Sequence, residues 1–369
     1  MTAARRALLA VALACCVVAA GAAPLRQLEK SWPHTDFSRR TVALDEIESG
    51  GVPKDGIPAI DAPAFESITS AQRWLDPQEP VIAVTLGEAS RAYPIQILIW
   101  HEIVNDELDG HPIAVTFCPL CNASLVFDRR VDGQVLSFGT TGMLRMSDLV
   151  MYDRQTGSWW QQFTGEGIVG VHAGTMLTPI HSQIVPFGLF ADGFPHAEVL
   201  SRPRGGGRPY GRNPYQGYDS VNSSPFAFRD RTDPRLRPME RVLGVRIGTD
   251  TVVYPLSKLR DEPVKNDTVG GKPIVVLATE QMRSPLDRSR IADSRTIPAA
   301  AAFSRDINGQ SHDFVVRDGV LVDEQTGSKW DLFGRAVTGP LAGQQLRPVD
   351  GGVHFAFAWL AFNPETRIR

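Results

Sequence analysis

The sequence predicts an α+β fold dominated by β-strands, arranged as two tandem repeats of a mostly antiparallel β unit with short helices. Segments such as PVIAVTL, HPIAVTF and DLVMYDR are short, rich in Val, Ile, Phe and Thr, and separated by DG or GE turns, a pattern typical of antiparallel strands. In addition, two stretches of the chain can be aligned with each other over most of their length, which indicates an internal duplication.

The composition is that of a soluble globular protein with substantial cores. The chain has 369 residues, of which 43% are hydrophobic and 21% are charged. The formal net charge of −3 offers no electrostatic attraction for nucleic acid or for an acidic membrane surface, so neither is predicted as a partner.

Residues 1–22 are predicted to be a secretory signal peptide, because Arg5 and Arg6 precede an apolar run and small residues suited to cleavage near Ala22. The run is shorter than the roughly 20 residues that span a bilayer, so we expect no integral membrane span after its removal. The protein is therefore expected to be exported, periplasmic or secreted. A lipoprotein anchor at Cys15 or Cys16 is the weaker alternative.

Four further segments follow in order. Residues 23–78 form a leader with a short helix near SITSAQRWL, and residues 79–200 form the first repeat. In that repeat, strands alternate with two helical pieces, IQILIWHE directly after Pro94 and FGLFADGF near its end. Residues 201–238 are a connector rich in Gly, Pro, Arg and aromatic residues, and we expect its aromatic side chains to be packed onto a domain surface. Residues 239–369 form the second repeat.

The two repeats differ at one informative place. Tyr93-Pro94 to Asn105-Asp106 aligns without a gap with Tyr254-Pro255 to Asn266-Asp267, and both repeats contain QTGS followed by tryptophan. The CPLC motif of the first repeat, however, aligns with a segment of the second that has no cysteine. The two thiols are therefore predicted to be a specialisation of the first repeat.

Cys118 and Cys121 are the only cysteines expected in the mature chain, and three roles are open to them. A disulfide between them closes a very small loop and adds little stability. A thioredoxin-type redox pair requires a helix that begins at the first cysteine, whereas NASLVFDR after the motif predicts a turn into a strand. A metal knuckle fits best, since Asn122 tolerates the positive φ such a bend requires. A thiol–disulfide oxidoreductase or redox sensor and a non-enzymatic binding module remain the alternatives.

A CPLC knuckle supplies only two ligands, so others must come from elsewhere in the fold. His101 is the predicted third metal ligand, while Glu102 and Asp153 are the predicted catalytic residues, as proton carriers or pocket groups. Softness of the ligands favours copper or zinc, with iron possible. The remaining candidates are two histidines that follow the WWQQF segment, three methionines that would favour Cu(I), two adjacent tryptophans, and two further polar groups: His172, His181, Met143, Met146, Met151, Trp159, Trp160, Asp148 and Arg154. His111 lies in a predicted turn and is expected to be exposed.

The segments AYPIQILIWHEIVND, VTFCPLCNASLVFDR, LVMYDRQTGSWWQQ, YGRNPYQGY and FAFAWLAFNPET together resemble the family called domain of unknown function 3179, over roughly residues 80–369. The resemblance implies an exported prokaryotic protein and no particular activity. It points to a cluster made of His101, Glu102, Asn105, Asp106, Cys118, Cys121, Asp148, Tyr152 and Asp153. The chain departs from the family pattern at Asn122, where glycine is usual, and at Met146, in a stretch that is often polar. The partner is predicted to be an unknown small molecule or an exported redox protein.

Overall fold

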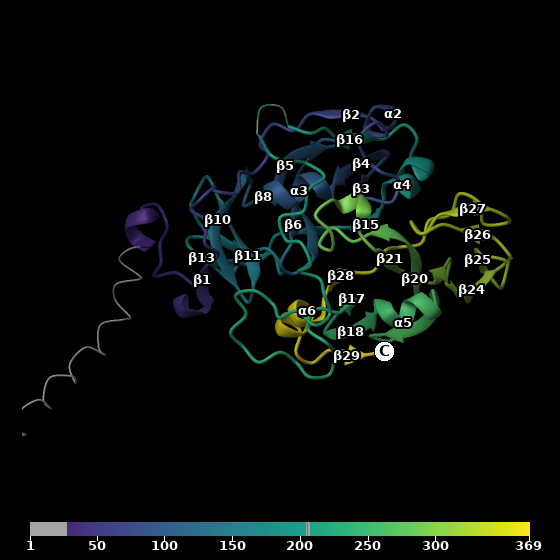
Figure 1. The fold of residues 1–369 in the computed structure, drawn as a ribbon. Helices are drawn as coiled ribbons and strands as arrows, with labels where there is room; N and C mark the ends of the chain where they lie inside the picture. Colours follow the sequence, from purple (N-terminus) through teal and green to yellow (C-terminus); the bar gives the residue numbers. More distant parts are fainter. Residues whose placement is uncertain (1–27, 204, 206) are drawn as a thin grey trace, which may run out of the picture.

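The computed structural model describes residues 28–369 except 204 and 206, and it confirms a β-dominated fold with several sheets and few short helices (Figure 1). The predicted signal peptide, residues 1–22, lies outside the described residues. Within the part of the chain that is described, no helix is both long enough and apolar enough to cross a membrane.

The first half of the chain forms three larger sheets and a small ribbon. The sheet of order β15-β3-β4-β16-β2 consists of β2 (Phe65–Ser67), β3 (Pro80–Leu86), β4 (Ala89–Pro94), β15 (Ser182–Pro186) and β16 (Glu198–Leu200). The sheet of order β14-β7-β6-β5 consists of β5 (Ile103–Leu108), β6 (His111–Cys118), β7 (Ala123–Asp128) and β14 (Pro179–Ile180). The sheet of order β1-β10-β11-β12-β13 consists of β1 (Ile47–Ser49), β10 (Phe138–Arg145), β11 (Asp148–Asp153), β12 (Trp159–Gln161) and β13 (Gly167–Val169), and the ribbon pairs β8 (Arg130–Val131) with β9 (Gln134–Val135).

The second half forms a similar set of sheets. The sheet of order β28-β17-β18-β29 consists of β17 (Arg241–Ile247), β18 (Asp250–Pro255), β28 (Gly351–Phe355) and β29 (Arg367–Ile368). The sheet of order β19-β20-β21 consists of β19 (Val264–Val269), β20 (Lys272–Arg283) and β21 (Thr296–Ser304). A third sheet, of order β24-β25-β26-β27, consists of β24 (Phe314–Arg317), β25 (Val320–Asp323), β26 (Lys329–Trp330) and β27 (Ala336–Thr338). A small ribbon pairs β22 (Asp306–Ile307) with β23 (Gln310–Ser311).

Short helices join these strands. They are η1 (Leu44–Glu46), α2 (Ile68–Ala71), α3 (Ile95–His101), α4 (Phe187–Gly193), α5 (Leu256–Asp261), η2 (Ile291–Asp293) and α6 (Ala356–Phe362). The helix predicted directly after Pro94 is confirmed as α3, for which Pro94 is the N-cap, and the one predicted near the end of the first repeat is confirmed as α4. The short helix predicted in the leader corresponds to α2.

The strand order of one sheet in each half is the same. In the first half, β3 pairs antiparallel with β15 and β4, and β4 pairs parallel with β16. In the second half, β17 pairs antiparallel with β28 and β18, and β18 pairs parallel with β29. A tyrosine–aspartate hydrogen bond also recurs, from Tyr93 Oη to Asp106 Oδ2 at 2.6 Å and from Tyr254 Oη to Asp267 Oδ2 at 2.7 Å. The tyrosine and aspartate of the aligned segments therefore brace the fold in both halves.

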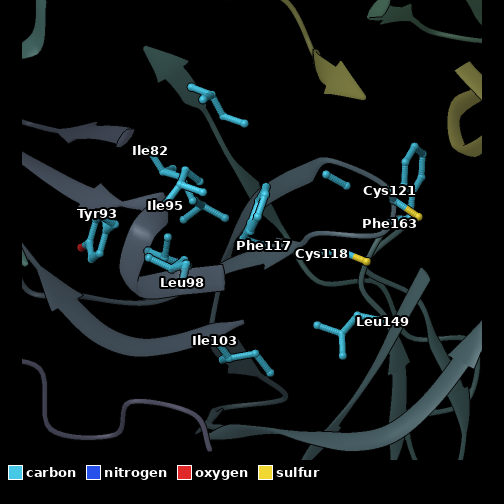
Figure 2. Packing of buried hydrophobic residues seen from close by; sticks show 14 of the residues in the cluster. Ile82, Tyr93, Ile95, Leu98, Ile103, Phe117, Cys118, Cys121, Leu149 and Phe163 are labelled. Atoms are coloured by element: carbon cyan, nitrogen blue, oxygen red, sulfur yellow. The ribbon is translucent and has the colours of Figure 1, made fainter. Parts of the chain in front are cut away.

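The two halves share a hydrophobic core. Tyr93, Phe117 and Cys118 of the first half belong to the same buried cluster as Val242 and Phe355 of the second. In Figure 2, one end of this cluster is formed around Tyr93 and Leu98, and the two cysteines lie at the other end. Burial of apolar surface thus joins the halves and encloses the thiols.

The connector lies against this core, as predicted from its aromatic residues. Tyr210, Tyr215, Tyr218 and Phe228 pack on the shared cluster, whereas Phe226 is 52% exposed. Aromatic side chains of this size supply the apolar contact that orders a segment with little regular secondary structure.

Candidate metal centre

The CPLC motif is a tight bend between two strands. β6 ends at Cys118, β7 begins at Ala123, and these two residues face each other in the antiparallel register. Asn122 adopts a φ of 50° and its backbone N–H donates to the carbonyl of Pro119 at 3.3 Å. The predicted turn into another strand is confirmed, and no helix begins at Cys118.

A third acidic group meets the two thiols in the interior of the protein. Ligand atoms of Cys118, Cys121 and Asp148 lie within 4.8 Å of one another, and all three residues are buried. Asp148 is the first residue of β11, which follows a turn at Met146 and Ser147. The carbonyl of Ser147 also faces both sulfurs, at 3.9 Å from Cys118 Sγ and 3.5 Å from Cys121 Sγ.

Asp148 is only half satisfied by hydrogen bonds. Its Oδ2 accepts from Gln161 Nε2 at 2.7 Å and from the backbone N–H of Phe163 at 2.9 Å. Its Oδ1 is buried and has no hydrogen-bond partner among the described residues, and the same holds for Ser147 Oγ. A buried acceptor without a partner is costly, so the free carboxylate oxygen beside the thiols is a position suited to a cation.

The acids at this site carry raised pKa values. Burial raises the pKa of Asp148 to about 7, while the hydrogen bonds from Gln161 and Phe163 and the nearby thiols of Cys118 and Cys121 lower it. Burial, and then the charge of Asp148, raise the pKa of Glu102 to about 8. Burial is also the main cause that raises the pKa values of both thiols. The site therefore concentrates groups that hold protons at neutral pH and would release them to a bound cation.

Backbone strain gathers around the same atoms. Ten described residues other than glycine have positive φ, and five of them directly precede a glycine in ordinary turns. Four of the other five are next to the thiols or to Asp148: Glu102, Asn122, Met146 and Ser147. Left-handed backbone at residues other than glycine costs of the order of 1–3 kcal/mol, and it is concentrated at functional sites.

His101, the predicted third metal ligand, lies outside this group. Its Nδ1 is 2.7 Å from the carbonyl oxygen of Pro58 and its Nε2 is 2.8 Å from the hydroxyl of Tyr210. Its place at the end of α3 thus gives both ring nitrogens a partner. The role of His101 as a ligand stays a prediction, one that this geometry does not support.

The carboxylate of Asp153, which is predicted to be catalytic, accepts hydrogen bonds that stabilise a turn. Its Oδ1 accepts from the backbone N–H of Thr156 at 2.6 Å, and its Oδ2 accepts from Trp160 Nε1 at 2.9 Å. Asp323 makes the corresponding bonds to Thr326 and Trp330 in the second half, where the thiols are missing. The shared D-x-Q-T-G-S segment therefore has a structural role, and a catalytic role for Asp153 stays a prediction without support from these contacts.

The other candidates are dispersed. His172 packs beside Trp160, His181 lies near Phe303, and His111 is exposed as expected. The buried Met151 is part of the shared core and Met143 packs beside a second cluster near the leader. Asp148 is the candidate that the structure brings to the thiols, although a polar run of this kind usually forms a solvated edge. The available signal was its position in GTTGMLRMSDLV, the stretch with no good counterpart in the second repeat.

A pocket of about 310 Å³ adjoins the centre. It is lined by Gly50, Val52, Ile57, Glu102, Leu120, Thr140, Gly142, Met143, Leu144, Leu149, Tyr215, Tyr218 and Phe226. Leu120 belongs to the CPLC bend, and Leu149 follows Asp148 directly. Tyr218 closes one side, because its hydroxyl donates to the carbonyl of Leu120 at 3.1 Å. Burial and then the charge of Glu102 raise the pKa of Tyr215.

The second half of the chain holds the bend in place. Phe355 N–H donates to the carbonyl of Cys121 at 2.9 Å, and Asn122 Nδ2 donates to the carbonyl of Val353 at 3.3 Å. Arg241, buried between the halves, donates to Asn122 Oδ1 at 3.3 Å and to Asp219 Oδ2 at 2.9 Å. The half without thiols thus supports the half that carries them.

Residues 54–366 match the model of a protein family described as "Protein of unknown function (DUF3179)". The chain belongs to this family. The resemblance of the sequence motifs is therefore confirmed, and it extends from the leader to within a few residues of the last one. Comparisons with curated proteins and with solved structures found no match.

Proposed function

We propose that this member of the DUF3179 family binds one transition-metal ion through Cys118, Cys121 and Asp148. The observation that carries the proposal is the convergence of these three buried ligands with a carboxylate oxygen that lacks a hydrogen-bond partner. Zn–S and Zn–O bonds of about 2.3 and 2.0–2.2 Å would require only a small contraction of such a group.

Zinc is the favoured ion, with copper and iron as the other candidates. Two thiolates and one carboxylate are each ligands that zinc accepts, whereas the carboxylate is less suited to Cu(I), which prefers thiolates and thioethers. Three protein ligands leave a fourth position, and that arrangement is typical of catalytic rather than closed structural sites.

Charge also supports the proposal. Burial and the charge of Asp148 raise the pKa of Glu102, and among the described residues no cationic side chain offsets them. A divalent ion would supply the positive charge with which buried thiolates and a carboxylate can be stable.

A redox role for the two thiols has weaker support. Thiol–disulfide exchange requires an accessible thiolate, whereas Cys118 and Cys121 are 1% and 0% exposed and burial raises their pKa values. An oxidoreductase or redox sensor remains the alternative, with an exported redox protein as its partner.

The wider setting of the site is also part of the proposal. Residues 79–200 and 239–369 are proposed to be tandem repeats of one ancestral unit, supported by the aligned motifs and by the common strand order. The N-terminal sequence supports export from the cytoplasm.

The proposal is tested by reconstitution of the reduced protein with Zn(II), Cu(I) and Fe(II), followed by elemental analysis. We expect one ion per chain in the wild type and less than a tenth of this in Cys118→Ser/Cys121→Ser, where both soft ligands are lost. A wild-type protein that stays metal-free with every ion, while both thiols titrate as reduced, would falsify it.

A further inference from the structure

The pocket beside the metal centre offers a ligand no counter-charge at neutral pH. Among the described residues that line it there is no lysine, arginine or histidine, and Glu102 is the one carboxylic acid. Burial and the charge of Asp148 raise the pKa of Glu102 to about 8, so this group is protonated at neutral pH. A charged ligand would lose its water in this pocket without gaining an opposite charge, which disfavours cations and anions alike.

Two of the three hydroxyl groups in the lining are already bonded to the protein. Thr140 Oγ1 donates to the carbonyl of Ile57 at 2.8 Å. Tyr218 Oη donates to the carbonyl of Leu120 at 3.1 Å and accepts from the backbone N–H of Phe226 at 3.2 Å. Because these hydroxyls need no partner from a ligand, the contacts left for a ligand are mainly apolar.

Apolar residues form most of the lining and extend to the protein surface. Leu144 and Leu149 are buried, whereas Val52 and Phe226 are 37% and 52% exposed. Exposed apolar side chains beside an apolar pocket are typical of a binding site. The volume of about 310 Å³ lies at the lower end of the range for small-molecule pockets, so the ligand is expected to be small.

Much of the lining comes from the segments that distinguish the first repeat from the second. Leu120 lies within CPLC, and five more lining residues lie within GTTGMLRMSDLV. Neither segment has a good counterpart in the second repeat. The pocket is therefore a feature of the specialised half, as the thiols are, and not a packing gap common to both halves.

We infer that this pocket binds a small uncharged organic molecule with an apolar body. The bound molecule lies beside the metal centre, because Leu120 is between the two cysteines of CPLC and Leu149 follows Asp148 directly. The three metal ligands themselves are not part of the lining. The inference thus goes beyond metal binding, and it gives a role to the aromatic residues that the connector packs beside the centre.

The experiment uses isothermal titration calorimetry on the purified full chain at pH 7 with three probes of the same shape. They are 1-naphthalenemethanol, which is neutral, 1-naphthylmethylamine, which is cationic at this pH, and 1-naphthoate, which is anionic. We expect saturable binding of the alcohol and binding about tenfold or more weaker for both ions, because their charges must be desolvated without compensation. No binding of the alcohol, or an equal affinity for either ion, would overturn the inference.

Two variants and a control locate the site. Phe226→Ala removes apolar contact and Val52→Asp adds a charge to the lining, so each is expected to weaken binding of the alcohol severalfold. Val337→Asp is the matched control, since Val337 is an exposed valine on β27 outside the lining, and wild-type affinity is expected. Unchanged affinity in both Phe226→Ala and Val52→Asp would contradict the assignment.

Metal content is measured on the same samples, so the two proposals are tested separately. Protein that retains one metal ion yet binds none of the alcohol contradicts only the pocket inference. Protein without metal that binds the alcohol, with the expected loss in Phe226→Ala and Val52→Asp, supports the pocket inference and contradicts only the metal centre.

Discussion

At the scale of single residues, the candidate site depends on the hydrogen bonding of one buried aspartate, Asp148. Asp148 and Asp153 are the two ends of β11, and both are fully buried. Asp153 is saturated by a turn and a tryptophan, whereas Asp148 retains an oxygen without a partner beside the thiols. The difference in hydrogen bonding, and not in burial, distinguishes a structural carboxylate from a candidate ligand.

Asp148→Asn is expected to lower metal affinity by about tenfold or more, because the amide is a poorer ligand than the carboxylate. His101→Gln is the comparison, and we expect it to leave metal affinity within about twofold of the wild type, since His101 is not in the group. Chelator competition monitored by metal release measures both. The reverse order of effects would show that histidine, and not aspartate, completes the centre.

The raised pKa values predict how the metal-free protein responds to pH. The pKa values of Asp148 and Glu102 are raised to about 7 and about 8 in the folded protein, from ordinary values of 3.8 and 4.5 in the unfolded chain. Burial also raises the pKa of Glu79 to about 7 and lowers the pKa values of His101, His181 and His354, and the histidines oppose the acids below about pH 6.5. From about pH 6.5 to 8 only the acids hold extra protons in the folded state, so stability falls as pH rises through this range. Thermal unfolding of chelator-treated protein across this range measures the effect.

Glu102→Gln removes one of the acids whose pKa is raised, so we expect a shallower fall in that variant. With metal bound the trend should reverse, since the ligands must lose their protons to bind the ion. A metal-free wild type whose melting temperature rises from pH 6.5 to pH 8 would contradict the assignment of the two buried acids.

At the scale of elements, strands and short helices were predictable, because alternating apolar residues and turn signals are local. The bend at Cys118–Cys121 followed from the residues after it, and Pro94 marked the start of α3. Local patterns did not predict the partner of the bend, although the family resemblance named Asp148 in one cluster with the thiols. Asp148 reaches the thiols because the turn at Met146 and Ser147, with positive φ at both residues, starts β11 beside them. His101 is closer in sequence but is directed to Pro58 and Tyr210 by the end of its helix.

The turn that follows β11 is expected to contribute stability and not function. Asp153→Asn and Asp323→Asn disturb equivalent turns, one in each half, and each should lower the free energy of unfolding by about 1–3 kcal/mol. Urea denaturation measures the loss. Metal content should stay at the wild-type level in both variants, and loss of metal in Asp153→Asn alone would assign that residue to the centre.

At the scale of the whole molecule, the second half acts as a support for the first. Its contacts with the bend come from β17 and β28 and include the buried Arg241, which is ion-paired with Asp219 of the connector. The shared core brings these strands to the thiols, so the site includes three segments far apart in the chain. Sequence alignment of the halves indicated which one carries the thiols, but the long-range packing between them is not encoded in local patterns.

Arg241→Met is expected to speed metal loss to a chelator severalfold, because Asn122 loses a hydrogen bond that fixes the bend. Arg246→Met on the same strand β17 is the matched control, since Arg246 contacts Asn363 and not the bend. Stopped-flow measurement of metal release compares the two. Equal rates in both variants would mean that the second half does not position the ligands.

The central claim is that two sulfurs and a carboxylate oxygen bind the metal, and X-ray absorption spectroscopy of the zinc-loaded protein tests it most directly. The predicted spectrum contains two sulfur scatterers at about 2.3 Å and oxygen scatterers at about 2.0–2.2 Å, with the sulfur contribution lost in Cys118→Ser/Cys121→Ser. A first shell without sulfur, or one with the multiple scattering of an imidazole in place of the carboxylate, would contradict it.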